Sequence, residues 1–224
     1  MSKHRLNLRA IERSLRDVQR QFPRINDVLQ SRRDSMTDVV IEHMMAGYAL
    51  VDKVLAEDTD LFTSRHSVSL LELNHMVLCG PDAKSRDDYC KHIDAATRRF
   101  YEQEECNIDH ILQWHHKHQT ESPWKRAAGV YVRILSQPQL YIEGNHRTGA
   151  LIMSYILARD GKAPFVLTVD NAKAYFDPST LVKETTKTAA TLLMKLPRMK
   201  KRFAHFLEDQ ADENYLGSGA SVGR

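Results

Sequence analysis

Apolar residues recur at steps of three and four along most of the chain, a periodicity typical of amphipathic α-helices. The clearest case lies in residues 4–33, where the apolar positions form a seam of three heptads: Leu8, Ile11, Leu15, Val18, Phe22, Ile25 and Leu29. Pro23 interrupts this seam, so we expect two helices that meet near Phe22. The best strand candidate, residues 165–169, is short. The sequence therefore predicts an all-α protein.

Turn and capping residues divide the rest of the chain into further helices. Gly80-Pro81 is a stop signal, and Ser122 followed by Pro123 is a start signal. Residues 79–92 are polar, and we expect a loop or a short hairpin there. The expected helices cover residues 36–57, 70–78, 93–117 with a break near 102–105, 124–135, 148–159, 171–176, 179–196 and 198–209. We expect a disordered tail over residues 210–224, because its last residues are small and polar.

Length and composition fit one globular core. The chain has 224 residues, of which 42% are hydrophobic. Charged residues interrupt the apolar stretches before they reach the roughly 20 residues that a bilayer span needs. The net charge is +3 and the pI is about 8.7, below the value of about 9 that marks a strong nucleic-acid footprint. We therefore expect no membrane span and no nucleic-acid partner.

The cysteines and the first residues point to a reducing compartment. Cys79, Cys90 and Cys106 are odd in number and have no CxxC spacing, so a disulfide framework is not expected. The chain begins Met-Ser-Lys-His-Arg, and no apolar leader segment follows. The sequence thus predicts a cytoplasmic protein.

Six arginines follow the N-terminal seam at helical spacing and share one face: Arg5, Arg9, Arg13, Arg16, Arg20 and Arg24. One interpretation is a solvated stripe whose aliphatic stems cover the edges of the seam. The other is a surface for phosphates or an acidic partner. The seam itself more often packs onto the parent core than onto a second copy, although a homodimer through the N-terminal helices is compatible with it.

The most informative stretch is residues 139–150, which reads Gln-Leu-Tyr-Ile-Glu-Gly-Asn-His-Arg-Thr-Gly-Ala. Gly144 allows a tight turn, and the helix expected from Thr148 would direct its free N–H groups into the loop, which makes an anion site. Arg147 adds a bidentate phosphate donor. Glu143 suits a Mg²⁺ ligand, because Mg²⁺ commonly takes one or two carboxylates together with phosphate oxygens.

This stretch resembles the signature of the Fic/Doc (Fido) family, HxFx(D/E)GNGRxxR, and aligns with it without gaps. Tyr141 takes the aromatic position, and Glu143, Gly144, Asn145 and Arg147 match. The similarity extends over roughly residues 36–200. It implies a helical bundle with a short flap hairpin over the motif loop, here residues 79–92. The chain would then comprise an N-terminal helical extension (1–35), a Fic/Doc-like core (36–209) and the tail (210–224).

The resemblance also implies a function. Family enzymes usually transfer AMP from ATP onto a hydroxyl of a target protein. Glu143 would hold Mg²⁺, and the ATP phosphates would lie on Gly144, Asn145, His146, Arg147 and Thr148. In phosphoryl-type transfer such positioning and charge stabilisation dominate.

Three positions depart from the family pattern. Gln139 replaces the histidine that acts as general base, and an amide can orient a nucleophile but cannot take its proton near pH 7. His146 replaces a glycine and is a candidate for the missing base. Ala150 replaces the second arginine, so a triphosphate loses one clamp.

These departures leave three interpretations. The chain is a nucleotide-binding transferase with altered chemistry, in which Gln139 positions the acceptor. Alternatively it is a catalytically inactive Fic-like module that binds a protein or a nucleotide. The third interpretation, a nucleic-acid-binding helical protein that uses the arginine stripe, predicts a steep salt dependence of binding.

Other ionisable residues are interpreted as structural. His115 and His118 share a helix face but have no acidic partner in register, so we expect an exposed helix end. Glu42 and Glu184 resemble the inhibitory glutamate of some family members imperfectly. With Ala150 in place of the arginine that such a glutamate pairs with, we interpret both as ordinary helical residues.

Overall fold

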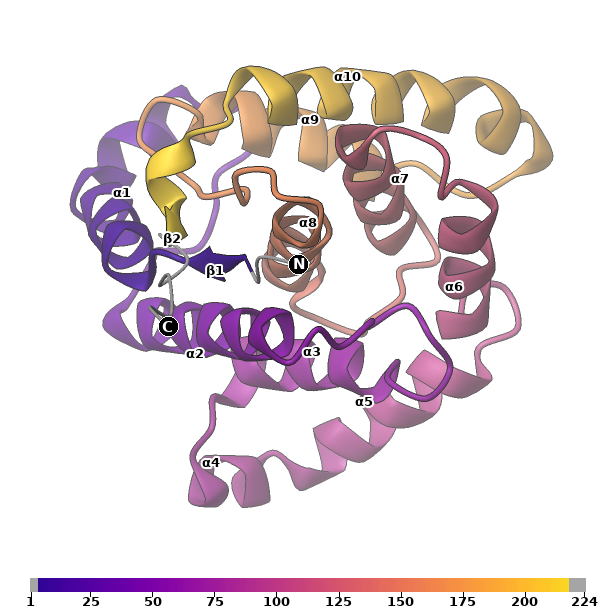
Figure 1. The fold of residues 1–224 in the computed structure, drawn as a ribbon, viewed down its shortest axis with the longest axis horizontal. Helices are drawn as coiled ribbons and strands as arrows, with labels where there is room; N and C mark the ends of the chain where they lie inside the picture. The colour runs from indigo at the N-terminus through magenta and orange to yellow at the C-terminus, as the bar shows by residue number, and fades with distance from the viewer. Residues whose placement is uncertain (1–3, 218–224) are drawn as a thin grey trace, which may run out of the picture.

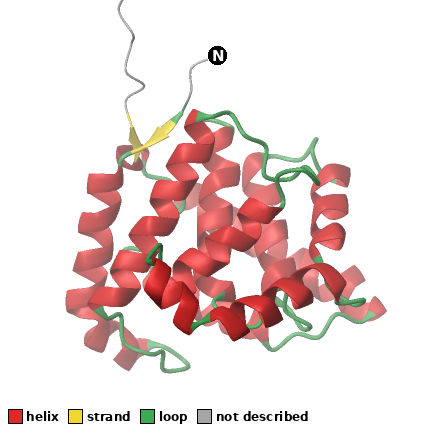
Figure 2. Cartoon of the chain, turned by 90° about the horizontal axis from the view of Figure 1, so that it is seen from below, coloured by secondary structure: helices red, strands yellow, loops and turns green. Residues whose placement is uncertain are grey.

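The computed structural model describes residues 4–217, and these are almost entirely helical (Figure 2), which confirms the predicted all-α class. The α-helices are α1 (Leu8–Val28), α2 (Asp38–Ala56), α3 (Val68–Cys79), α4 (Ala83–Asp88), α5 (Cys90–Glu102), α6 (Ile108–Lys117), α7 (Pro123–Leu135), α8 (Asn145–Arg159), α9 (Ala172–Lys183) and α10 (Leu196–Asp209). Two short strands, β1 (Arg5–Leu6) and β2 (Leu216–Gly217), pair antiparallel, so the first and last described segments lie side by side.

Helix α8 lies at the centre of the bundle, where Figure 1 shows it nearly end-on. Every residue from Thr148 to Ala158 is buried, which explains why this helix is apolar all round. It packs against α2, α3 and α7, and α10 covers α7. No helix within residues 4–217 combines the length and apolar character needed to cross a bilayer. The motif therefore begins the most deeply buried helix of the protein.

The N-terminal segment forms one helix, so the predicted division near Phe22 is wrong. α1 continues through Pro23, which removes a helix hydrogen bond at a cost of about 3 kcal/mol. Burial of one large apolar side chain contributes about 1.5–3 kcal/mol. The stabilisation from burying the seam therefore exceeds the cost of the proline. The buried seam residues are Ile11, Leu15, Val18, Phe22 and Ile25. The seam packs onto the chain's own core, with α1 against α2 and α9.

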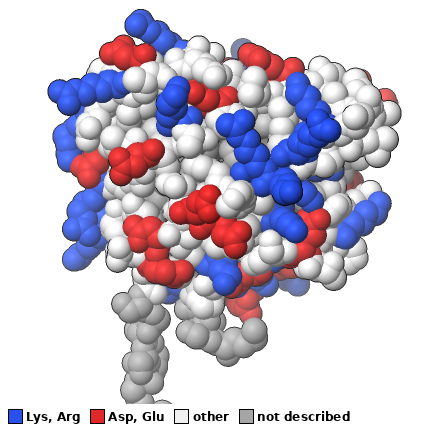
Figure 3. All heavy atoms as spheres, turned by 90° about the horizontal axis from the view of Figure 1, so that it is seen from above, with Lys and Arg blue, Asp and Glu red and all other residues white. Residues whose placement is uncertain are grey.

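The arginine stripe, of which Arg5 lies in β1 and the other members lie on α1, is largely exposed, and some of its members pair with acidic side chains. Arg16 donates to Asp38 at 2.6 Å, and Arg5 binds Asp52 through Nε (2.8 Å) and Nη2 (2.5 Å). Seen from the α10 side, Lys and Arg gather in groups with Asp and Glu between them (Figure 3). These pairs fit the solvated-stripe interpretation.

The predicted flap hairpin is absent from residues 79–92, which form α4 and the start of α5 instead. Gly80 ends α3 with φ of 69°, as the stop signal indicated. Asp82 then caps α4, because its Oδ2 accepts from the backbone N–H of Ser85 at 2.8 Å. This cap favours a helical turn over a hairpin. The predicted break near 102–105 is confirmed, since α5 ends at Glu102 and α6 begins after the cap Asn107.

Three further expectations are corrected. Residues 165–168 have no regular secondary structure and Val169 begins a turn, so no strand forms there. The carbonyl of Phe165 accepts from the hydroxyls of Tyr48 and Ser154. The helix predicted over 179–196 is divided between α9, which runs through Pro178, and the π-helix η1 (Thr191–Lys195). The predicted tail is structured up to Gly217 by the 3-10 helix η2 (Glu213–Tyr215) and β2, and its remainder lies outside the described residues.

His115 is buried, so the expectation of an exposed helix end is wrong at this position. Its ring stacks on Phe62 with centroids 3.8 Å apart, and burial lowers its pKa to about 4. His118 is half-buried, and its Nδ1 lies 2.7 Å from the carbonyl of Trp114. The apolar partner Phe62, from the α2–α3 connection, could not be inferred from the spacing of the histidines.

Candidate functional site at the N-terminus of α8

Gly144 ends the motif loop in a left-handed conformation, with φ 74° and ψ 5°, which glycine adopts at little cost. Helix α8 begins at Asn145, three residues before the predicted Thr148. The N–H of Thr148 donates to Gly144 at 2.9 Å, but within residues 4–217 the N–H groups of Asn145, His146 and Arg147 have no acceptor. Three N–H groups at the positive end of the helix dipole thus have no acceptor in the described part of the chain.

The side chain of Asn145 shapes the loop. Its Oδ1 accepts from the N–H of Tyr141 at 3.0 Å, and its Nδ2 donates to the carbonyl of Tyr141 at 2.9 Å. The Tyr141 side chain is fully buried and donates to the carbonyl of Leu70 on α3. The side-chain amide of Asn145 therefore holds the turn, and its backbone N–H takes no part in these hydrogen bonds.

Gln139 lies in the same loop, and its side chain is turned inward. Its Nε2 donates to the carbonyl of Leu135 at 3.0 Å, and its Oε1 lies 3.4 Å from Nδ2 of Asn145. Arg99 of α5 holds the Gln139 carbonyl from Nε (3.1 Å) and Nη2 (2.7 Å). The side-chain amide of Gln139 is thus used in holding the loop.

Glu143 presents an exposed side chain directly before the N-terminus of α8. Its backbone carbonyl accepts from Nδ2 of Asn74 at 2.9 Å, and the same nitrogen donates to Oγ1 of Thr148 at 3.0 Å. In the described part of the chain, no group of three or more His, Cys, Asp or Glu residues could enclose a metal. A single accessible carboxylate beside an anion site fits Mg²⁺, which is commonly held by few carboxylates and by substrate phosphates.

Arg147 anchors the first turn of α8 to the end of α3. Its Nη1 donates to the carbonyl of Val77 at 2.6 Å. Burial lowers the pKa of this guanidinium, and the nearby carboxylates of Glu143 and Asp34 oppose that shift. Arg147 remains charged near neutral pH, so the site keeps a cation beside the free N–H groups.

His146 belongs to a buried hydrogen-bond network on the other side of α8. Ser179 donates to the carbonyl of Tyr175 at 2.6 Å, so its oxygen accepts from the hydroxyl of Tyr131 at 2.7 Å. We therefore assign the proton of His146 to Nδ1, which lies 3.2 Å from the Tyr131 oxygen, and Nε2 accepts from Nη1 of Arg33 at 3.3 Å.

This network determines the charge of His146. Burial, and then the charges of Arg33 and Lys183, lower its pKa to about 3. The imidazole is therefore neutral near pH 7, and both of its nitrogens have partners. A base with so low a pKa has little driving force to accept a proton, so the geometry does not favour His146 as a substitute for the missing histidine.

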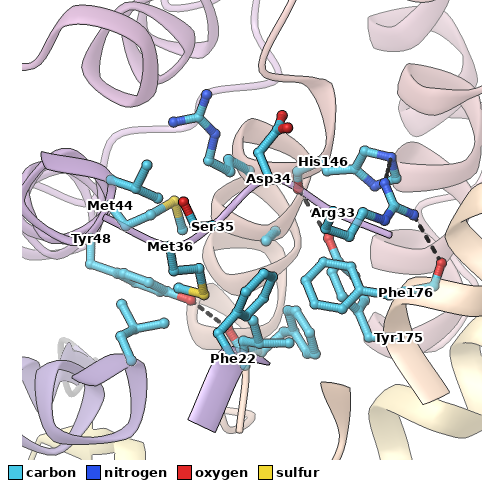
Figure 4. A pocket seen from close by; sticks show the side chains of 16 residues that line it. Phe22, Arg33, Asp34, Ser35, Met36, Met44, Tyr48, His146, Tyr175 and Phe176 are labelled. Atoms are coloured by element: carbon cyan, nitrogen blue, oxygen red, sulfur yellow. Dashed lines mark hydrogen bonds between the residues drawn. The ribbon is translucent and has the colours of Figure 1, made fainter. Parts of the chain in front are cut away.

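A cavity of about 320 Å³ adjoins this network and the first two turns of α8 (Figure 4). His146, Arg147 and Ala150 line it from α8, and Arg33 and Asp34 line it from the α1–α2 connection. The remaining walls are mainly apolar side chains. The cavity thus joins the candidate anion site to an apolar space.

The predicted site residues stay together in the structure, because residues 139–148 form one loop and helix start. Sequence reasoning missed Asn74, Arg99 and Arg33, which hold this segment from α3, α5 and the α1–α2 connection. Asn74 is a polar residue among apolar residues in the helix predicted over 70–78, which was an available signal. Nothing local distinguishes Arg33 and Arg99 from the other arginines.

Comparison with known protein families, with curated proteins and with solved structures gave no match.

Proposed function

We propose that this chain binds a Mg²⁺-associated nucleotide at the N-terminus of α8 and acts as a Fic-like transferase with altered chemistry. The observation that carries the proposal is the set of N–H groups of Asn145, His146 and Arg147, which follow a left-handed Gly144 and have no acceptor among residues 4–217. Backbone donors and a helix dipole in this arrangement favour phosphate.

Charged side chains next to these N–H groups are also complementary to a Mg²⁺-bound phosphate. Arg147 supplies a fixed positive charge, and Glu143 is the carboxylate that would hold Mg²⁺ together with phosphate oxygens. When bound, Mg²⁺ would neutralise phosphate charge, while the chain's own groups orient the nucleotide. The acceptor would be a hydroxyl of a target protein, and Gln139 would lie beside it.

Isothermal titration of the full chain with ATP, with and without Mg²⁺, tests the proposal. We expect Mg²⁺-dependent binding that is lost in Glu143→Ala and retained in Glu42→Ala, a matched exposed glutamate on α2. Absence of binding to ATP, ADP and AMP by the folded chain would contradict the proposal. If Glu143→Ala and Glu42→Ala bind Mg²⁺–ATP equally well, Glu143 does not hold the metal.

A second candidate is a Fic-like module that binds a nucleotide or a protein without turnover. It is favoured by the inward-turned amide of Gln139 and by the neutral, fully partnered His146, because neither offers a base near the loop. Incubation with ATP labelled in the α-phosphate separates the two candidates. Label that enters protein supports the transferase, and label recovered only as intact ATP supports the binding module.

A further inference from the structure

The cavity beside α8 combines an apolar body with a charged end. Phe22 of α1, Met36 before α2, Met44 of α2 and Phe176 of α9 are among its apolar walls. Figure 4 shows Met36 and Met44 across the cavity from Arg33 and His146, whereas Phe176 lies beside Arg33, whose guanidinium carbon is 5.3 Å from the centroid of its ring. The volume of the cavity is about 320 Å³. Mostly apolar cavities of roughly 300–1,000 Å³ with few convergent polar groups are typical of small-molecule sites.

Arg33 is incompletely partnered at this cavity. Its Nη1 lies 3.3 Å from Nε2 of His146, and its Nη2 donates to Oγ1 of Thr180 (2.6 Å) and to the carbonyl of Phe176 (3.2 Å). Its Nε is buried and has no hydrogen-bond partner in the described chain. A buried donor without an acceptor is costly, and more so on a charged group. Nη1 carries two N–H groups and contacts only His146 in the described chain, so its second N–H is the donor that a ligand's acceptor could take.

The charges around the cavity determine which ligand is complementary. Arg33 and Arg147 are cations, Asp34 is the one carboxylate among the lining residues, and His146 is hydrogen-bonded at both nitrogens. The lining thus has one excess positive charge. The remaining walls have no charge with which to bind a second anionic group.

We propose that this cavity binds a small amphiphilic monocarboxylate, with its carboxylate at Arg33 and its apolar body among Phe22, Met36, Met44 and Phe176. Arginine is suited to this recognition because its N–H groups match carboxylate oxygens. The proposal uses neither the Glu143 carboxylate nor the free N–H groups of α8, and the cavity shares only Arg147 and His146 with the proposed nucleotide site.

Octanoate is a suitable probe, measured by isothermal titration with the full chain. Octylamine and octanol have the same alkyl chain with a positive or a neutral head group. We expect octanoate to bind at least about tenfold more tightly than either, a difference that a charge-assisted hydrogen bond accounts for. Equal binding of octanoate and octylamine would overturn the proposal.

Two variants locate the site. Arg33→Gln should weaken octanoate binding by about tenfold or more, whereas Arg32→Gln, an exposed neighbour that does not line the cavity, should bind it like the wild type. If Arg33→Gln does not fold, Met36→Asp provides the same test, because it places a second carboxylate in the lining and should abolish octanoate binding. Wild-type affinity in the Arg33 or Met36 variant would overturn the proposal.

Glu143→Ala separates this proposal from the nucleotide site. It should lose Mg²⁺–ATP binding and keep octanoate binding. Loss of octanoate binding in a folded Glu143→Ala protein would overturn the inference without bearing on the nucleotide proposal.

Discussion

Arg99 donates from both Nε and Nη2 to the backbone carbonyl of Gln139, and so ties α5 to the motif loop. Hydrogen bonds from a charged donor contribute about 1.5–3 kcal/mol each to stability in favourable cases. We expect Arg99→Ala to lower the free energy of unfolding by about 2 kcal/mol and to weaken Mg²⁺–ATP binding, because the loop would lose its position. Chemical denaturation and titration measure the two effects.

The neighbouring Arg98→Ala is the control, since Arg98 is exposed on the same helix. It should behave like the wild type in both measurements. Equal effects of the two substitutions would mean that the contact with Gln139 has no special role.

Gln139→His should separate the transferase from the binding module. A histidine at this position would supply the missing general base, which typically contributes a factor of about 10²–10⁴ in rate. If the chain is a transferase, AMP transfer to protein should rise by about that factor, while Gln137→His should leave it unchanged. Retained Mg²⁺–ATP binding without any gain in transfer would favour the binding module.

Gly144→Ala should reduce stability and nucleotide affinity together. A residue with a Cβ costs about 1–2 kcal/mol in the left-handed region, and a Cβ at Gly144 would lie 3.0 Å from Nδ2 of Asn74. Gly161 has a similar φ of 71° but lies at the far end of α8. Gly161→Ala should therefore lose similar stability and keep Mg²⁺–ATP affinity. Equal losses of affinity in the two variants would show a global rather than a local effect.

His115 should make the fold sensitive to acid. Its pKa in the folded chain is about 4, below its ordinary value of 6.5, because the ring is buried. Between these values the unfolded chain binds more protons than the folded chain, so stability is retained above pH 6.5 and falls as the pH drops toward 4. At pH 5 this linkage amounts to about 2 kcal/mol for one fully shifted histidine.

Chemical denaturation at pH 7 and pH 5 measures this loss. His115→Phe keeps an aromatic ring against Phe62 and should lose about 2 kcal/mol less than the wild type between the two pH values. His116→Gln, on the exposed side of α6, should lose as much as the wild type. If His115→Phe has the same pH dependence as the wild type, acid sensitivity arises elsewhere.

Local signals in the sequence predicted most of the helices correctly. Ser122 with Pro123 opens α7, Gly80 closes α3, and the all-α class follows from the apolar period. Prediction failed where packing opposed a local rule. α1 passes through Pro23 because its seam is buried, and Asp82 starts a helix where polarity had indicated a hairpin.

The candidate site also combines features that local sequence predicted with features that it did not. Gly144 and the start of α8 are contiguous in the sequence, so local reasoning predicted a tight turn followed by a helix, although the helix begins at Asn145 and not at Thr148. Local reasoning did not predict the roles of the side chains. Asn74 and Glu143 are separated by 69 residues, and Arg33 and His146 by 113.

The sequence by itself determined the helical class and a tight turn at Gly144. Tertiary structure alone decided that Gln139 is turned inward, that His146 is neutral, and that Arg33 lies at the end of an apolar cavity. The physical reason is the distance along the sequence over which each property is determined. Backbone conformation at a turn depends on adjacent residues, whereas burial, charge state and hydrogen-bond partners depend on which distant helices pack together.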